Sequence, residues 1–126
     1  MSGQADRARL GRRGEIKARR FLWRRGLRTL AANWRHPSGG ELDLVMRDGD
    51  VLVIVEVRTA RKVFAGGPAQ TVGPEKQRRL ARLAQLYLAR APFTPRGVRF
   101  DVVGVVHRGL LRWEITWYRD AFQVGS

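Results

Sequence analysis

Acidic residues interrupt two stretches of otherwise apolar sequence. Residues 40–45 read Gly-Glu-Leu-Asp-Leu-Val, residues 55–59 read Val-Glu-Val-Arg-Thr, and Asp48-Gly49 lies between them. An Asp-Gly dipeptide between apolar runs is a strong signal for a β-hairpin. The second stretch also ends an unbroken apolar run, at a point where a buried strand would ordinarily continue with an apolar residue. The sequence therefore predicts a hairpin that holds carboxylates on a rigid sheet.

The register of this hairpin decides whether the acids meet. A two-residue loop at the Asp-Gly dipeptide places Glu41 opposite Glu56 and Asp43 opposite Ile54. Directly opposed residues share a face, so the three acids and Arg58 are expected to project from one side of the hairpin. The diagonal from Asp43 to Glu56 would then be about 7–8 Å, short enough for both carboxylates to reach a common point. A slip of one residue would send one acid to the opposite face.

Neighbouring carboxylates on a rigid support repel one another and stay ionised most easily with a cation between them. Mg²⁺ takes hard oxygen ligands, typically one or two carboxylates, with water and substrate phosphate completing the shell. Asp43 and Glu56 are therefore candidate ligands for Mg²⁺ or Mn²⁺, and Arg58 adds a fixed positive charge beside them. The alternative is a pair of strand-end acids that face water, with Arg58 as their ion-pair partner.

The elements around the hairpin follow from apolar spacing. A helix is expected over about 6–25, before a glycine suited to a helix C-terminus. Glu15 lies on its predicted inward face and is either a third member of the acidic site or the partner of a nearby arginine, an interaction worth only about 0.2–0.5 kcal/mol. The inward face comprises Gly11, Glu15, Ala18 and Leu22.

The remaining elements complete one α/β domain of 126 residues with irregular ends at about 1–5 and 123–126. A strand over 27–34 precedes the hairpin. A helix over 74–90, with Leu80, Leu83, Ala84 and Tyr87 inward, precedes strands over 98–106 and 111–117 that are joined by a turn at 107–109. The connection from 59 to 73 is long for a structureless loop, which favours a functional role.

The formal net charge of +14 indicates a polyanionic partner, either nucleic acid or an anionic membrane. Basic residues crowd the start of the second helix, where the helix dipole disfavours them unless an anion is present. The absence of cysteine excludes disulfides and thiolate metal sites. We find no stretch suited to a signal peptide or membrane span, and expect a cytoplasmic protein without membrane contact. The candidate nucleic-acid-binding residues are Arg12, Arg13, Arg61, Lys62, Lys76, Gln77, Arg78 and Arg79.

Ordered short matches along nearly the whole chain carry a resemblance to known proteins. They include Arg13-Gly14-Glu15, Ala31-Ala32-Asn33-Trp34, Gly40-Glu41-Leu42-Asp43-Leu44, Val55-Glu56-Val57-Arg58-Thr59, Gly66-Gly67, Lys76-Gln77-Arg78 and Phe100-Asp101-Val102-Val103. The chain resembles the YraN family of uncharacterised bacterial proteins. More broadly, it resembles the PD-(D/E)xK superfamily of restriction-endonuclease-like proteins and archaeal Holliday-junction resolvases. The resemblance implies an αβββαβ core with a mixed central sheet flanked by helices, and an additional C-terminal strand.

The resemblance also implies a function. Glu15, Asp43 and Glu56 would be the catalytic and metal-binding acids of an Mg²⁺-dependent or Mn²⁺-dependent nuclease, and Arg58 would occupy the position of the motif's lysine. Arginine stays charged, so Arg58 could stabilise transition-state charge but could hardly activate water. No base-reading motif is visible, which favours structured or branched DNA as substrate. A homodimer is an arrangement that the resemblance allows. The alternatives are a non-catalytic nucleic-acid-binding module and a basic protein-interaction domain.

Overall fold

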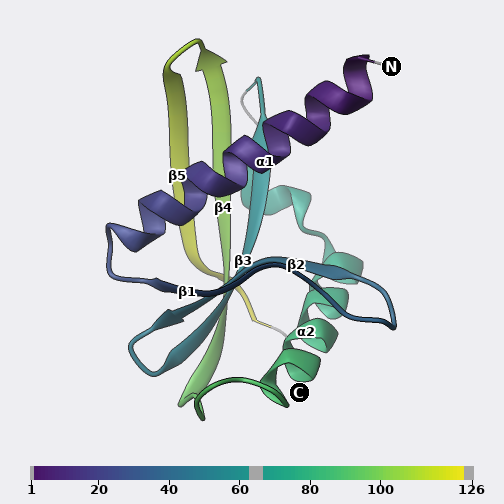
Figure 1. Ribbon diagram of the computed structural model, residues 1–126, viewed down its shortest axis with the longest axis vertical. Coiled ribbons are helices and arrows are strands. Elements are labelled where there is room, and N and C mark those ends of the chain that lie inside the picture. The colour runs from purple at the N-terminus through teal and green to yellow at the C-terminus, as the bar shows by residue number, and fades with distance from the viewer. Residues whose placement is uncertain (1, 63–66, 124–126) are drawn as a thin grey trace.

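The computed structural model describes residues 2–62 and 67–123 and shows a five-stranded sheet with helices on both faces (Figure 1). This confirms the predicted mixed α/β architecture. The helix α1 extends into residues 2–5, which were expected to be irregular. The elements, in chain order, are α1 (Ser2–Trp23), β1 (Arg28–Arg35), β2 (Glu41–Asp48), β3 (Val51–Ala60), the 3-10 helix η1 (Pro68–Thr71), α2 (Pro74–Leu88), β4 (Gly97–Gly109) and β5 (Arg112–Phe122).

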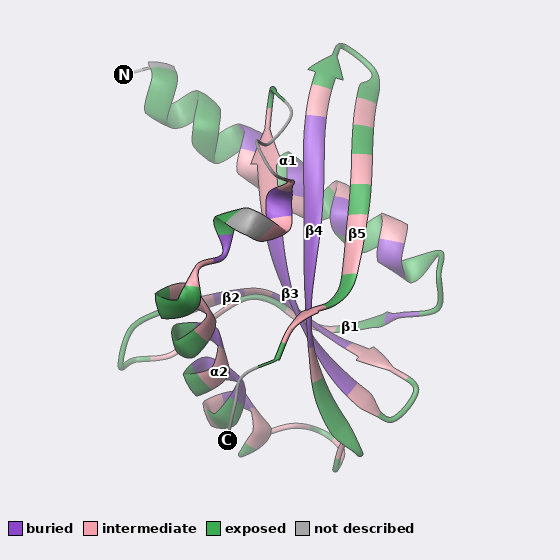
Figure 2. Ribbon diagram, turned by 180° about the vertical axis from the view of Figure 1, so that it is seen from behind, coloured by how far each residue is buried: buried purple, intermediate pink, exposed green. Residues whose placement is uncertain are grey.

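The strands lie in the order β1-β2-β3-β4-β5, and only the β3–β4 pair is parallel. The chain returns from β3 to β4 through α2, as a parallel pair requires a crossover. α1 covers one face of the sheet and α2 covers the other, so β3 and β4 are largely buried (Figure 2). This explains why the sequence of β3 reads as a continuous apolar run.

α1 ends and packs as the sequence predicts. The N–H of Leu27 donates to the carbonyl of Leu22, and Gly26 adopts a φ of +98°, which completes a glycine-dependent helix C-terminus. Gly14 permits a close approach to the sheet, because a Cβ there would lie 2.1 Å from Oγ1 of Thr59 on β3. This approach holds Glu15, the next residue, against the sheet.

α2 also confirms its predicted inward face, because its buried residues are Leu80, Leu83, Ala84 and Tyr87. Pro74 occupies the first turn, where a missing N–H costs nothing. The helix ends at Leu88, slightly before the expected boundary. Its N-terminal turn follows η1 directly and faces the C-terminal half of β3.

The predicted hairpin forms, but its register differs from the expected one by two residues. Asp48 pairs with Val51, so the turn is Gly49-Asp50 and not Asp48-Gly49. Gly49 has a φ of +61° and Asp50 does not have a positive φ, which fits a turn with glycine at the first central position. A shift of two residues keeps every side chain on its predicted face.

The last two strands are longer than expected. β4 continues through Gly109 and β5 through Phe122, so the predicted turn at 107–109 instead falls at Leu110 and Leu111. At the other end of this pair, the fully buried Asp101 carboxylate accepts hydrogen bonds from the Arg99 guanidinium, the Trp117 indole and the backbone N–H of Asp120. Asp101 is therefore a structural acid that ties β5 to β4.

The sheet divides between β2 and β3. Their pairing extends only as far as Leu44 opposite Val55, whereas β2 stays paired with β1 as far as Glu41. β3 stays paired with β4 as far as Ala60. Figure 1 shows β1 and β2 turning away from β3 and β4. We call the opening between these two strand pairs the fork, and both helices border it.

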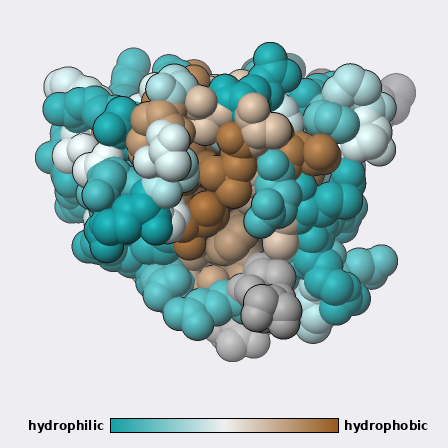
Figure 3. All heavy atoms as spheres, turned by 90° about the horizontal axis from the view of Figure 1, so that it is seen from below, coloured by the Kyte–Doolittle hydropathy of each residue, from teal (hydrophilic) through white to brown (hydrophobic). Residues whose placement is uncertain are grey.

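An apolar groove of about 700 Å³ lies at the opposite end of the molecule, between α2 and the ends of β4 and β5. Figure 3 shows this end as a hydrophobic area framed by hydrophilic side chains. Its apolar lining includes Ala84, Leu88, Val98, Phe100 and Phe122. It is larger than the hollow in the fork, but it holds no cluster of acids. Within the described residues, no helix is both long enough and apolar enough to cross a membrane.

Candidate active site in the strand fork

Asp43 and Glu56 lie on either side of the fork. Asp43 directly precedes Leu44, and Glu56 directly follows Val55, where the pairing of β2 with β3 ends, and the two carboxyl groups interact. Asp43 turns one oxygen into the opening, where it accepts the backbone N–H of Val57 at 2.9 Å. Glu56 is only 4 % exposed. The fork thus brings the two predicted metal ligands together.

The surroundings of Asp43 favour its protonated form. Burial and the neighbouring negative charge of Glu56 raise the pKa of Asp43 from 3.8 to about 7. The hydrogen bond from Val57 and the positive charge of Lys76 act in the opposite direction and are weaker. A carboxyl group with this pKa is about half protonated near neutral pH. A cation placed beside it would favour its charged form.

Glu15 reaches the same cluster from α1. Burial and the charge of Asp43 raise the pKa of Glu15 from 4.5 to about 7, although a hydrogen bond from Asn33 opposes the rise. The Asn33 amide, oriented with its nitrogen toward the acids, donates to Glu15 Oε1 at 2.9 Å and to Glu41 Oε1 at 2.8 Å. Asn33 adopts a φ of +52°, a backbone conformation that asparagine tolerates better than most residues. Asn33 thus links Glu15 to the outer acid Glu41.

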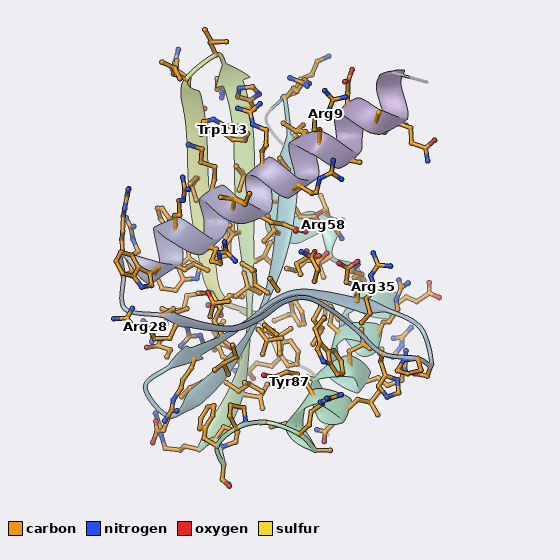
Figure 4. The ribbon with its side chains drawn as sticks, in the orientation of Figure 1. Arg9, Arg28, Arg35, Arg58, Tyr87 and Trp113 are labelled. Atoms are coloured by element: carbon orange, nitrogen blue, oxygen red, sulfur yellow. The ribbon has the colours of Figure 1, made fainter. Side chains whose placement is uncertain are left out.

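Two cations face Glu56. Lys76 Nζ lies 3.3 Å and the Arg58 guanidinium 3.5 Å from Glu56 Oε2. Arg58 also donates to the carbonyl of Thr71 in η1, and its Nε is buried with no hydrogen-bond partner among the described residues. In Figure 4, carboxylate oxygens gather between the labelled Arg58 and Arg35. Lys76 was predicted to bind nucleic acid along a surface, but the structure places it at the acids.

The donor set matches part of a metal site. Among the described residues, no group of three or more His, Cys, Asp or Glu side chains has the geometry to hold a metal ion. Asp43 and Glu56 nevertheless present two hard carboxylate donors at a hollow of about 360 Å³, which Glu15 and Arg58 also line. Mg²⁺ commonly takes only one or two protein carboxylates and obtains its other ligands from water and phosphate. The residues present fit such an ion in that mode.

The other candidate nucleic-acid-binding residues do not form one cluster. Gln77 donates to the Val72 carbonyl at 2.9 Å, which fixes the start of α2. Arg78 and Arg79 are exposed on α2, and Arg61 and Lys62 are exposed just beyond β3. Arg12 and Arg13 are exposed on α1, with Arg12 beside the hollow that includes Glu15. Residues 63–66, part of the predicted functional connection and including Gly66, lie outside the described residues.

Sequence reasoning missed two contributors to the site. Nothing in the sequence of β1 marks Asn33 as the residue that holds Glu15 and Glu41, because its role depends on one strained backbone angle. The contact between Lys76 and Glu56 was also missed, although the unfavourable basic start of α2 was a signal that these cations meet an anion. One such anion is the carboxylate of Glu56 in the protein itself.

The fold and the fork define a small, strongly basic α/β protein with a carboxylate site at the point where its sheet divides. Residues 14–105 match the uncharacterised protein family UPF0102, and the chain belongs to this family. The UPF0102 protein YraN from Salmonella newport, from Salmonella heidelberg and from Salmonella agona is in each case 45% identical over 123 residues. The alignment covers 96% of this chain and 89% of the relative. The predicted relationship to the YraN family is thereby confirmed.

Proposed function

We propose that this protein is a metal-dependent nuclease that hydrolyses phosphodiester bonds in nucleic acid, with structured or branched DNA as the preferred substrate. The observation that carries the proposal is the meeting of Asp43 and Glu56 in the fork, with Lys76 and Arg58 beside them. The acids offer a place for a divalent ion, and the cations offer contacts for a phosphate group. The net charge of +14 supports a polyanionic substrate.

Each residue has a distinct role in the proposed reaction. Asp43 and Glu56 hold Mg²⁺ or Mn²⁺, and Glu15 completes or orients the ligand set. When bound, the ion supplies an activated water and a positive charge for the phosphate oxygens. Arg58 stabilises negative charge on the phosphate in the transition state, through the guanidinium group that lies beside Glu56.

Sequence preference is expected to be weak. The exposed arginines on both helices suit phosphate contacts, which position a nucleic acid without reading its bases. Substrate choice then depends on shape, since branched or flapped DNA presents phosphates at angles that a regular duplex does not. Exposed basic residues also make binding strongly dependent on salt concentration.

The test is cleavage of labelled single-stranded, duplex, flapped and four-way-junction DNA with Mg²⁺ or Mn²⁺. We expect the wild type to cut at least one of these substrates, and Asp43→Asn to lose about 100-fold or more of the rate. Asp6→Asn, which changes an exposed acid on α1, is the matched control and is expected to retain activity. Equal activity in wild type and Asp43→Asn would refute the proposed site.

Arg58 favours one alternative function. Because an arginine stands where the nuclease motif has a lysine, a non-catalytic nucleic-acid-binding module is the second candidate. Tight binding of the same substrates without cleavage by wild type or Arg58→Lys would support it. Weak binding even at low salt would instead support a basic protein-interaction domain.

A further inference from the structure

The tip of the β4–β5 hairpin displays two leucines to solvent. Leu110 and Leu111 are each 89% exposed, the highest exposure among the exposed large hydrophobic residues in the described parts of the chain. A two-residue hairpin loop ordinarily contains glycine, asparagine or aspartate, because those residues tolerate the required backbone angles. Neither folding of the hairpin nor packing of the core accounts for leucine at both positions.

The tip extends beyond the rest of the sheet. β3 pairs with β4 only as far as Val106, whereas β4 and β5 remain paired as far as Gly109 and Arg112. Three further residues of strand correspond to about 10 Å of projection. Figure 1 shows the hairpin standing at the same end of the molecule as the C-terminal end of β3.

The projecting segment is braced along its length. His107 stacks on its cross-strand partner Trp113, with ring centroids 4.2 Å apart and an interplanar angle of 17°. From α1, the Arg13 guanidinium lies 5.1 Å and Lys17 Nζ 5.6 Å from the Trp113 ring centroid. Figure 4 shows the labelled Trp113 on the upper part of the hairpin, toward its tip. A rigid support therefore presents the two leucines.

Basic residues lie on both sides of the leucine loop and beside Trp113 on β5. Arg108 and Arg112 flank the loop directly, and Arg13 and Lys17 of α1 lie over the ring of Trp113, the residue after Arg112. Glu114 is the only acid in the segment from 107 to 114, and it forms an ion pair with Arg108. An apolar tip within a basic frame is complementary to a polyanion that exposes apolar surface at a gap, as a branched nucleic acid does where bases lose a stacking neighbour.

We propose that the β4–β5 tip is a wedge that inserts Leu110 and Leu111 against unstacked bases at a branch point or helix end, while the flanking arginines hold the adjacent phosphates. Apolar side chains that enter a base step unstack it and stabilise bent or open nucleic acid. The wedge would supply the shape recognition that the proposed function requires. This inference rests on the nucleic-acid binding proposed above. Because β3 and β4 are parallel, the tip lies at the same end of the sheet as the C-terminal end of β3, which Arg61 and Lys62 follow in the chain.

The experiment compares wild type with the double variant Leu110→Ser/Leu111→Ser. Both side chains are exposed, so the double variant is expected to keep its fold and its thermal stability. The probes are a four-way junction carrying 2-aminopurine at the branch point and a linear duplex of the same sequence. Anisotropy reports affinity, and 2-aminopurine emission reports loss of base stacking. Val98→Thr, a change at an exposed apolar residue at the other end of β4, is the matched control.

We expect wild type and Val98→Thr to raise the 2-aminopurine emission on binding the junction. The double variant should show no such rise in emission. Its affinity for the junction should fall about tenfold, the size expected from one lost base contact. Its affinity for the duplex should stay unchanged. An unchanged emission rise in the double variant would overturn the wedge and leave the nuclease proposal intact. Absence of DNA binding by the wild type at low salt would overturn both.

Two further outcomes would give Leu110 and Leu111 a different role. Co-sedimentation of the wild type with phosphatidylglycerol vesicles, lost in the double variant and without an emission change on DNA, would overturn the wedge in favour of a membrane contact. A wild type that is dimeric in sedimentation velocity, with a monomeric double variant and no emission change, would overturn it in favour of self-association.

Discussion

Replacing Asp43 by asparagine should stabilise the folded protein at alkaline pH. Asparagine resembles the protonated acid in shape and can still accept the hydrogen bond from Val57. The folded state raises the pKa of Asp43 from 3.8 to about 7, chiefly through burial and secondly through the charge of Glu56. Each tenfold change in an acid dissociation constant is worth about 1.4 kcal/mol. The full rise therefore corresponds to roughly 4 kcal/mol, and partial exposure of Asp43 reduces our expectation to about 2–4 kcal/mol.

The sign of the effect follows from the two ionisation equilibria. Below a pH of about 4, Asp43 is protonated in both the folded and the unfolded chain, and wild type and Asp43→Asn should differ little. As the pH rises from about 4 to 7, the unfolded wild type releases this proton more readily than the folded one, so the wild type loses stability relative to the variant. Above about pH 7.5 the difference should be complete.

Urea denaturation with a chelator present, at several pH values between about 4.5 and 8, measures this difference as a change in the free energy of unfolding. The control Asp6→Asn should shift stability by less than about 0.5 kcal/mol at every pH. A variant that is less stable than the wild type at the highest pH would refute the raised pKa of Asp43 in the folded protein. A difference in stability that does not vary with pH would refute it as well. Adding Mg²⁺ at ten times its dissociation constant should return about 1.4 kcal/mol to the wild type and nothing to Asp43→Asn.

Three further variants test other contacts. Gly14→Ala should destabilise the protein by about 1–3 kcal/mol in urea denaturation, and Thr59→Ala in the same chain should restore most of the loss, because the threonine oxygen would lie 2.1 Å from the new Cβ. Asp101→Asn should cost about 3–5 kcal/mol by the same measurement, since it breaks a buried charge pair, and a loss below about 1 kcal/mol would contradict its structural role. If the protein is the proposed nuclease, Lys76→Met should slow single-turnover cleavage by about 100-fold even at saturating protein, because its ammonium group lies at the acids. Recovery of the full rate at saturation would show that Lys76 only binds substrate.

The apolar patterns of the helices were sufficient to predict how they pack. Leu80, Leu83 and Ala84 repeat at helical spacing and are buried as expected. Glu15 was recognised as the acid on the inward face of the first helix for the same reason. These predictions succeed because they rely on periodicity within one element, which the surrounding protein changes little.

The details of the site depended on contacts between elements, which periodicity does not specify. The hairpin register moved by two residues because Gly49, and not Asp48, occupies the first central position of the turn. The division of the sheet lies beyond Leu44 and Val55, where β2 and β3 cease to pair although each keeps its other neighbour. The approach of Lys76 to Glu56 requires α2 to begin at a particular place beside β3. No short stretch of sequence contains that information.

The fork depends on strands that are synthesised at different times. The acids at 15, 43 and 56 are synthesised before β4, which begins at Gly97 and is the parallel partner of β3. Until β4 is synthesised, β3 has no partner on the side away from β2. A chain truncated before Gly97 would carry every acid of the cluster but would lack the strand that pairs with β3 along its length. We therefore expect the site to assemble only when the sheet is complete.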